Sequence, residues 1–556
     1  MSDIGTIRRP RAVEFGILGA ALLACLLPFA NKAFHIDDTL FVWAGQHISE
    51  HPLDFYGFNV NWYLTWEPMS QVTQNPPVGC YYLALVGSLF GWGEFGLHLA
   101  MLLPAWGAVW GTYRLSGRFG VRPLPAALLT LLSPAFLVCG TSVMCDVLML
   151  CLWLWTVIVW DRGLRERSAG LLCVAGGLIA LTTVTKYFGL CLVPLLGVYS
   201  LAVDRAGWRR WAAGLGVAVV LLAAYQAAFS SLYAVDRGLT GAMGYAVGVG
   251  HQSFGGRVYR LFEGLGFVGG CVGFAAVPAI ALLPRRWLPI LGLTVIVAMF
   301  ASYVLTGVTT YESGYLLTDS PFAANANDDH PLPVGVLFQF LVWVAAGTAI
   351  LLLSIDDLRT HRDPVALLLF LWVLGTFVFA AYVNWALNGR SVLPLIPAVA
   401  MVLVRRLERE TGSPWRMATL LVPAAALALV VTYADARTAD ANRTAAERLV
   451  AEVSSPPGRP LWFEGHWGFQ YYAQTAGARA WDFEGSAGRA GDSLMIPFNN
   501  CLTAPPSGFA KEVGTIDVPA CPWAATMYPY VGAGFYACNF DWRPLPFVFT
   551  KVPPER

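Results

Sequence analysis

Long apolar stretches recur along most of the first 433 residues, and they constrain the fold more than any other feature. A helix that spans a bilayer needs about 20 mostly apolar residues. Charged residues make up only 13% of the 556-residue chain, against about 25% in soluble proteins. The sequence therefore predicts a polytopic α-helical membrane protein with about thirteen spans. The runs lie near 13–30, 95–115, 122–139, 143–160, 168–184, 187–203, 211–232, 262–283, 288–306, 335–354, 365–384, 391–404 and 415–433.

Two apolar segments need a separate decision. The run at 13–30 follows the basic stretch IRRPR, as in a signal peptide, but it is long and no clear small-residue cleavage site follows it. We therefore expect a retained first transmembrane helix. The segment PPVGCYYLALVGSLFG (76–91) is short, begins with two prolines and ends in glycine. It is predicted to be an interfacial helix on the outer surface.

The distribution of arginines predicts the orientation. If the N-terminus is cytoplasmic, few cations lie outside, as the positive-inside rule requires. The C-terminus is then outside, and a spanning 76–91 segment would reverse the asymmetry. The expected outer cations are Lys32, Lys186, Arg237, Arg257, Arg260 and Arg390. The expected inner arginines are Arg8, Arg9, Arg11, Arg114, Arg118, Arg122, Arg162, Arg165, Arg167, Arg205, Arg209, Arg210, Arg285, Arg286, Arg359, Arg362, Arg405, Arg406, Arg409 and Arg416.

The composition changes at about residue 434, where charged, Gly, Pro and Trp residues return. We expect a transmembrane domain over 1–433, with a first outer loop at 31–94 that carries interfacial helices. Residues 434–556 are predicted to form a small soluble α/β domain on the outer face, because 460–485 reads as strand, turn, helix and strand. An exported domain can form disulfides. One bridge is expected among Cys501, Cys521 and Cys538, and the sequence leaves the pairing open.

Ionisable residues gather at the predicted outer edge of the bilayer. Asp37 and Asp38 follow the first span, and Asp146 begins the fourth. Lys186 lies at the turn between the fifth and sixth spans, and Arg390 precedes the twelfth. Charges at this depth are costly unless they are paired, hydrated or used. These five residues therefore form the candidate site.

Each of these residues also has a simpler interpretation. Either aspartate of the pair, or Asp146, can cap the helix that it begins. Lys186 can extend to lipid phosphates without specificity, and Arg390 can be an interfacial anchor. The aromatic cluster NWYLTWEP (61–68) is more often an interfacial belt than a sugar platform. In NDDHP, Asp328, Asp329 and His330 are possible metal ligands, although a solvated loop is the commoner reading.

The motifs together resemble the GT-C glycosyltransferases of the protein O-mannosyltransferase and lipid A aminoarabinose transferase type (glycosyltransferase family 39). The family has an acidic pair in the first outer loop, here Asp37-Asp38. Its His-Pro-Pro segment with tyrosines is similar to NPPVGCYYLAL, with Asn75 in place of His. Its further motifs are an Asp at the fourth span, a TK pair and an RYLLPLIP segment. They match Asp146, Thr185-Lys186 and RSVLPLIP, in which Ser391 replaces Tyr.

The resemblance implies an inverting transferase of the bacterial inner membrane. It would move a hexose or pentose from a polyprenyl-phosphate carrier to a hydroxyl of a glycan, lipid or protein on the periplasmic face. Asp37 would be the general base, while Asp38 would orient the acceptor, bind a cation or cap the helix. Lys186 and Arg390 would hold the lipid phosphate, and Asp146 would shape the acceptor side or fix a basic neighbour. The family motif adds Tyr81 and Tyr82 as substrate-binding candidates.

The expected partners are the sugar donor, the acceptor and membrane lipids. A divalent cation is possible, and no other cofactor is implied. The net charge of +1 says nothing about nucleic acid, but no basic run resembles a nucleic-acid-binding arm, so no nucleic-acid partner is expected. The main alternative, a transporter or flippase of lipid-linked sugars, predicts charges near the bilayer midplane and an internal repeat. The sequence displays neither. A receptor or assembly scaffold would leave the charges at the membrane edge unexplained.

Overall fold

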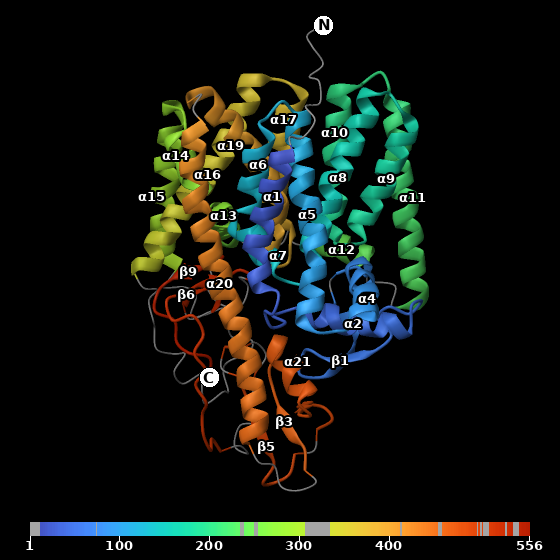
Figure 1. Ribbon diagram of the computed structural model, residues 1–556, viewed down its shortest axis with the longest axis vertical. Helices are drawn as coiled ribbons and strands as arrows, with labels where there is room; N and C mark the ends of the chain where they lie inside the picture. The colour runs from blue at the N-terminus through green and yellow to red at the C-terminus, as the bar shows by residue number, and fades with distance from the viewer. Residues whose placement is uncertain are drawn as a thin grey trace.

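The computed structural model describes most of the chain. It covers residues 12–73, 75–233, 238–248, 254–305, 334–411, 414–453, 459–486, 488–497, 499–500, 503, 511–528, 531–537 and 544–556. A long bundle of helices carries strands and short helices at one end, which is the lower end in Figure 1.

Every predicted apolar run coincides with helix. The helices in the predicted spans are α1 (Ala12–Leu26), α5 (Glu94–Arg118), α6 (Pro123–Leu131), α7 (Pro134–Gly140), α8 (Asp146–Arg165), α9 (Ala169–Thr183), α10 (Leu192–Val203), α11 (Trp208–Leu232), α13 (Phe254–Val272), α14 (Val277–Ala281), α15 (Leu288–Leu305), α16 (Val334–His361), α17 (Pro364–Val378), α19 (Ile396–Thr411) and α20 (Pro414–Glu452). The other helices are α2 (Asp38–Glu50), α3 (Met69–Val72), α4 (Val78–Phe90), α12 (Leu239–Gly248), α18 (Gly389–Val392) and α21 (Trp467–Thr475).

The membrane character of the bundle follows from helix length and apolarity. Within the described ranges, 8 helices are long and apolar enough to cross a membrane, or 9 if the bent pair α6 and α7 is one span. Three shorter apolar helices cover Val78–Phe90, Ala169–Thr183 and Tyr187–Val203. The polytopic helical architecture is therefore confirmed, and the count of about thirteen spans stays a prediction.

The break between α6 and α7 has a local cause. The two helices meet at 63°. Pro134 occupies the first turn of α7, where the missing N–H costs nothing. The Ser133 hydroxyl accepts a hydrogen bond from Phe136 N and so caps the new helix. A capping serine followed by proline thus restarts the helix in a new direction.

Arginines that the sequence places on the inner side form ion pairs with buried carboxylates, two arginines to each carboxylate. Arg118 at the end of α5 and Arg165 at the end of α8 both donate to Asp161. Arg286 and Arg406 both pair with Asp356. These contacts join the ends of helices that lie far apart in the sequence. The arginines therefore gather by pairing with acidic side chains of the bundle.

At the opposite end of the bundle, α2 and α4 lie side by side (Figure 1). Helix α4 has 13 residues, too few to span a bilayer alone. Its outer side exposes Leu85, Leu89 and Phe90. Its first N–H, on Val78, donates to the carbonyl of Val184 just beyond α9. The start of α4 is thereby anchored two residues from Lys186.

The C-terminal segment begins with α20, which is 39 residues long. The predicted domain boundary at 433/434 lies inside this unbroken helix, which ends at Glu452. Beyond it, β3 (Leu461–Phe463), β4 (Arg479–Ala480) and β5 (Ser493–Met495) form a parallel sheet in the order β4-β3-β5, and α21 connects β3 to β4.

The remaining strands form short antiparallel pairs. They are β1 (Asn59–Asn61) with β2 (Trp66–Pro68), β6 (Ala524–Ala525) with β9 (Val548–Phe549), and β7 (Met527–Tyr528) with β8 (Ala533–Gly534). Cys521 is a buried free thiol. Cys501 and Cys538 lie outside the described residues, so a bridge between them stays a prediction.

Candidate active site

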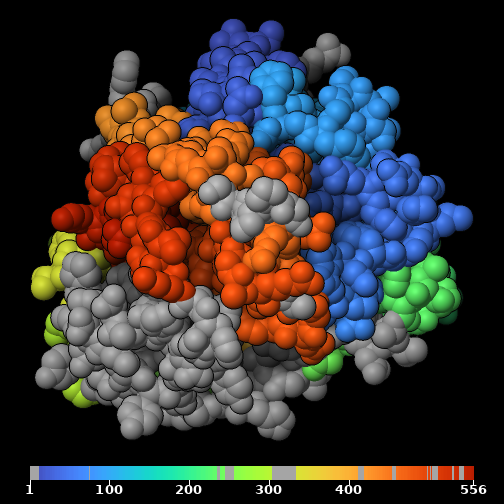
Figure 2. All heavy atoms as spheres, turned by 90° about the horizontal axis from the view of Figure 1, so that it is seen from below, coloured from blue at the N-terminus to red at the C-terminus, as the bar shows by residue number. Residues whose placement is uncertain are grey.

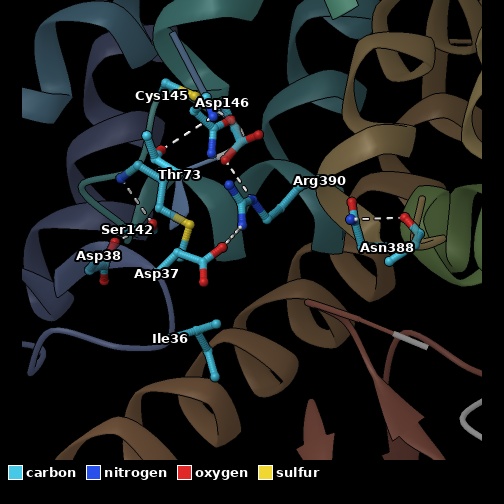
Figure 3. Close-up of polar contacts among 12 residues, drawn as sticks. Ile36, Asp37, Asp38, Thr73, Ser142, Cys145, Asp146, Asn388 and Arg390 are labelled. Carbon is cyan, nitrogen blue, oxygen red and sulfur yellow. Dashed lines mark hydrogen bonds and ion pairs between the residues drawn. The ribbon is translucent and has the colours of Figure 1, made fainter. Parts of the chain in front are cut away.

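Arg390 is the centre of the candidate site. Its Nη1 donates to Asp37 Oδ2 at 2.7 Å, and its Nε donates to Asp146 Oδ2 at 2.9 Å. Figure 3 shows the guanidinium between the two carboxylates. The Arg390 side chain is only 7% exposed, so it is not an interfacial anchor. Burial alone would lower its pKa, but Asp146 and Asp37 raise the pKa above its usual value.

Asp146 joins the second cation to this centre. Its Oδ1 accepts from Lys186 Nζ at 2.5 Å, while its Oδ2 holds Arg390. Asp146 is 2% exposed and Lys186 is 15% exposed. Lys186 is thus paired, not extended toward lipid. The structure brings Asp37, Asp146, Lys186 and Arg390 into one cluster of two carboxylates and two cations.

The two adjacent aspartates have different surroundings. Asp38 is fully buried, and its Oδ1 accepts from Ser142 Oγ at 2.7 Å and from Val143 N at 2.9 Å. Its Oδ2 accepts from His35 N at 3.0 Å. Burial raises the pKa of Asp38 to about 6, against the lowering effect of Lys32 and these hydrogen bonds. This geometry ties the first outer loop to the turn before α8 and keeps the Asp38 carboxylate buried.

Asp37 has the opposite character. It occupies the N-cap position of α2, but its side chain makes no capping hydrogen bond. Its carboxylate is 30% exposed and faces Arg390. The preceding residue, Ile36, has a φ of 51°. A β-branched residue in this left-handed region is strained, and such strain persists only where neighbouring contacts hold it.

Arg390 lies on a very short helix that is held at its start. Asn388 accepts the N–H of Ser391 at 2.7 Å and so caps α18. Ser391 Oγ also accepts a hydrogen bond from the side-chain amide of Asn384 at 2.6 Å. The serine in RSVLPLIP, where the family has tyrosine, is therefore buried in the local turn.

The family-derived tyrosines point elsewhere. The hydroxyl of Tyr81 donates to the carbonyl of Pro52 at 2.5 Å, and that of Tyr82 donates to Ala100 at 2.6 Å. Asn75 lies nearer the site, because its Oδ1 is 3.7 Å from the thiol sulfur of Cys145, next to Asp146. Substrate binding by Tyr81 and Tyr82 stays a prediction.

The NWYLTWEP segment contacts the C-terminal segment. Asn61 donates to the carbonyl of Trp481 at 2.9 Å, and Phe483 N donates to Leu64 O at 3.0 Å. Trp66 remains half-exposed. This part of the first outer loop therefore packs against the C-terminal segment.

The metal question concerns Asp328, Asp329 and His330, which lie outside the described residues. Elsewhere in the described chain, no three His, Cys, Asp or Glu side chains gather so as to hold a metal ion.

Sequence reasoning missed a second buried ion pair beside the site. Lys32 Nζ lies 2.5 Å from Asp435 Oδ2, and both side chains are fully buried. The sequence marks Lys32 only as an outer cation, and Asp435 falls in the Ala-rich stretch YADART. Because Lys32 and Asp435 are 403 positions apart in the sequence, no local sequence pattern indicates that they pair.

The comparisons with known proteins bear on part of this region. Residues 74–229 match the family model described as dolichyl-phosphate-mannose-protein mannosyltransferase. The matched range includes Asp146 and Lys186 and excludes Asp37 and Arg390. It confirms the predicted resemblance to the GT-C glycosyltransferases. No curated protein matches the chain.

Two solved structures are similar at low identity. One is the crystal structure of ArnT from Cupriavidus metallidurans bound to undecaprenyl phosphate, with 14% identity, a TM-score of 0.47 and coverage of 84% of this chain and 85% of that chain. The other is ArnT from the same organism in the apo state, with 15% identity, a TM-score of 0.39 and coverage of 87% and 84%.

Proposed function

We propose that the protein is an inverting glycosyltransferase that moves a sugar from a polyprenyl-phosphate carrier to an acceptor hydroxyl. One observation carries the proposal. At one end of an apolar helix bundle, the partly exposed carboxylate of Asp37 pairs with Arg390, whose guanidinium also pairs with the buried carboxylate of Asp146. A base for the acceptor and cations for the leaving phosphate are the groups that this reaction needs.

The cations suit the leaving group. When the bond between sugar and phosphate breaks, negative charge develops on the lipid phosphate. Arg390 and Lys186 are fixed at a common partner, Asp146, so they need little rearrangement to meet that charge. Charge-assisted hydrogen bonds from a guanidinium to phosphate are strong and directional.

The base is assigned to Asp37 by exposure. Of the three carboxylates, Asp37 is 30% exposed, whereas Asp146 is 2% exposed and Asp38 is fully buried. A general base must reach the acceptor proton. A single displacement with inversion needs one such base. Asp38 then fixes the loop, and Asp146 fixes the two cations.

The family match supports the donor class. The description of the matching family refers to mannose on dolichyl phosphate, a polyprenyl-type carrier, and the matched range contains Asp146 and Lys186. We extend the proposal to a hexose or pentose and to a glycan, lipid or protein acceptor. We place the reaction on the periplasmic face of a bacterial inner membrane, where the C-terminal segment would lie.

The test uses the full-length protein in nanodiscs with a panel of radiolabelled undecaprenyl-phosphate sugars and an envelope extract as acceptor. The wild type should release undecaprenyl phosphate and label the acceptor. Arg390→Gln and Lys186→Gln should each slow transfer tenfold or more, because a hydrogen bond to a charged group contributes about 1.5–3 kcal/mol. Arg257→Gln is the matched control, since Arg257 is an exposed cation at the start of α13.

Two results would contradict the proposal. Unchanged kinetics in both cluster variants would remove the cations from the site. Movement of intact donor across a vesicle membrane, with no cleavage of the sugar–phosphate bond, would support the transporter instead.

A further inference from the structure

A second buried network lies behind the candidate site, at Asp435 of α20. Asp435 Oδ2 accepts from Lys32 Nζ at 2.5 Å and from the Tyr536 hydroxyl at 3.0 Å. Its Oδ1 accepts from Thr526 Oγ1 at 2.7 Å. All four residues are buried. The network therefore binds the first outer loop to three separate parts of the C-terminal segment.

The loop that leads to Asp37 is held at consecutive residues. After Lys32, the N–H of Ala33 donates to Asp440 Oδ1 at 3.1 Å, and the N–H of Phe34 donates to the Tyr472 hydroxyl at 2.8 Å. Gly468 of α21 packs so closely that a Cβ there would lie 2.2 Å from the carbonyl oxygen of Phe34.

These anchors explain the strained backbone next to Asp37. Ile36, with its φ of 51°, lies between the anchored residues 32–34 and the buried Asp38. A β-branched residue keeps this conformation only where both sides are fixed. The direction of the Asp37 side chain toward Arg390 thus depends on contacts made by α20 and α21.

The same network reaches Arg390 from the other side. Thr526 O accepts from Phe535 N at 2.7 Å, and Phe535 O accepts from Gly389 N at 2.7 Å. A Cβ on Gly389 would lie 2.4 Å from the Phe535 ring. A continuous path therefore runs from Lys32 through Asp435, Thr526 and Phe535 to the residue before Arg390.

The C-terminal segment and the first outer loop share one face of the molecule. Figure 2 views the molecule from the end that carries the candidate site, and the orange and red C-terminal residues lie directly beside the blue residues of that loop.

We infer that the C-terminal segment is a working part of the active site: through Asp435 and Thr526 it sets the position of Asp37 relative to Arg390. Asp435 and Thr526 are positioning residues, since they act through the Asp37–Arg390 pair. The effect on transfer rests on the proposed function, but the effect on the two site segments does not.

The first measurement is hydrogen–deuterium exchange on the full-length protein in nanodiscs. Thr526→Val keeps the shape and removes the hydroxyl that holds Asp435. Exchange should rise both in peptides over 33–40 and in peptides over 387–392. Thr526→Ser, which keeps the hydroxyl, should restore the wild-type pattern. A rise in only one of the two segments, or in neither, would overturn the inference.

The second variant acts from the other anchor. Gly468→Ala forces a methyl group against Phe34 O and should raise exchange over 33–40. Gly514→Ala is the matched control, because a Cβ at Gly514 meets nothing within 4 Å. If Gly468→Ala fails to fold, the Thr526 pair still decides the question.

Transfer assays then separate positioning from simple stability. Thr526→Val should lower kcat per folded molecule at least tenfold at saturating donor, with Thr526→Ser near the wild-type rate. A lowered midpoint with unchanged kcat per folded molecule would mean a purely structural role. If the wild type transfers no sugar while both segments respond to Thr526→Val, the proposed function fails and the positioning inference stands.

Discussion

Asp37 and the donor phosphate should compete for Arg390. The guanidinium holds Asp37 through Nη1 and Asp146 through Nε. Asp146 is buried with two cationic partners, so Asp37 is the carboxylate that an incoming anion can displace. Asp37→Asn keeps the side-chain shape and removes the competing charge. We expect this variant to bind a lipid phosphate more tightly while it loses transfer.

The magnitude follows from the contact. A hydrogen bond to a charged group contributes about 1.5–3 kcal/mol. Asp37 is 30% exposed, and solvent screening places the pair at the lower end of that range. About 1.4 kcal/mol is a tenfold change in affinity. The variant should therefore bind undecaprenyl phosphate about tenfold more tightly, while the loss of a general base slows transfer about 10²–10⁴-fold.

The assay is equilibrium binding of undecaprenyl phosphate to protein in neutral-lipid nanodiscs, at two ionic strengths. Glu50→Gln is the matched control, because it removes one negative charge from the exposed end of the same helix, α2. Equal or weaker binding by Asp37→Asn, relative to this control, would refute the competition. Full transfer activity in Asp37→Asn would remove Asp37 as the base.

Four further outcomes are expected. Asp146→Asn should lower stability by about 3–5 kcal/mol, because it breaks a buried ion pair. Thermal unfolding followed by tryptophan fluorescence should detect this, and an unchanged midpoint would contradict it. Asp38→Asn should lower stability by about 1–3 kcal/mol, because its side-chain amide would face the N–H of His35. It should nevertheless transfer sugar faster than Asp37→Asn, and the reverse order of the two rates would exchange the proposed roles. Burial lowers the pKa of His466 from 6.5 to about 4, partly offset by a hydrogen bond with Gln470. As the pH falls, His466 therefore binds a proton in the unfolded chain before it does so in the folded protein. Stability should then fall as pH drops from about 6.5 to 4, by up to about 1.4 kcal/mol per pH unit, and it should fall less steeply in His466→Gln. The same dependence of stability on pH in both proteins would contradict the role of His466. Alkaline phosphatase fused at the C-terminus should be active in bacteria, and a cytoplasmic signal would overturn the orientation.

Much of the architecture could be predicted because apolar runs of span length leave a chain few options. The cluster could be anticipated from Asp146, Lys186 and Arg390, since scarce charges at one membrane depth must pair or act. Neither argument depends on contacts between distant segments.

The difference in surroundings between the partly exposed Asp37 and the buried Asp38 could not be predicted from the residues. It depends on the left-handed conformation of Ile36, which Phe34 and Lys32 support through the C-terminal segment. The domain boundary was obscured for a related reason. The Ala-rich residues after 433 are strong helix formers, so α20 continues where the hydropathy falls.

The neutral cluster has a consequence for turnover. Asp37 and Asp146 balance Lys186 and Arg390, so the cluster of four side chains carries no net charge. On the proposed reaction, the donor is a phosphodiester with one negative charge, whereas the released lipid phosphate is a monoester with about −1.5 to −2 at neutral pH, as for a phosphorylated side chain. The same two cations therefore attract the spent carrier more strongly than the loaded one. On the proposed reaction, the same two cations that stabilise the leaving phosphate would therefore also slow the departure of the carrier lipid.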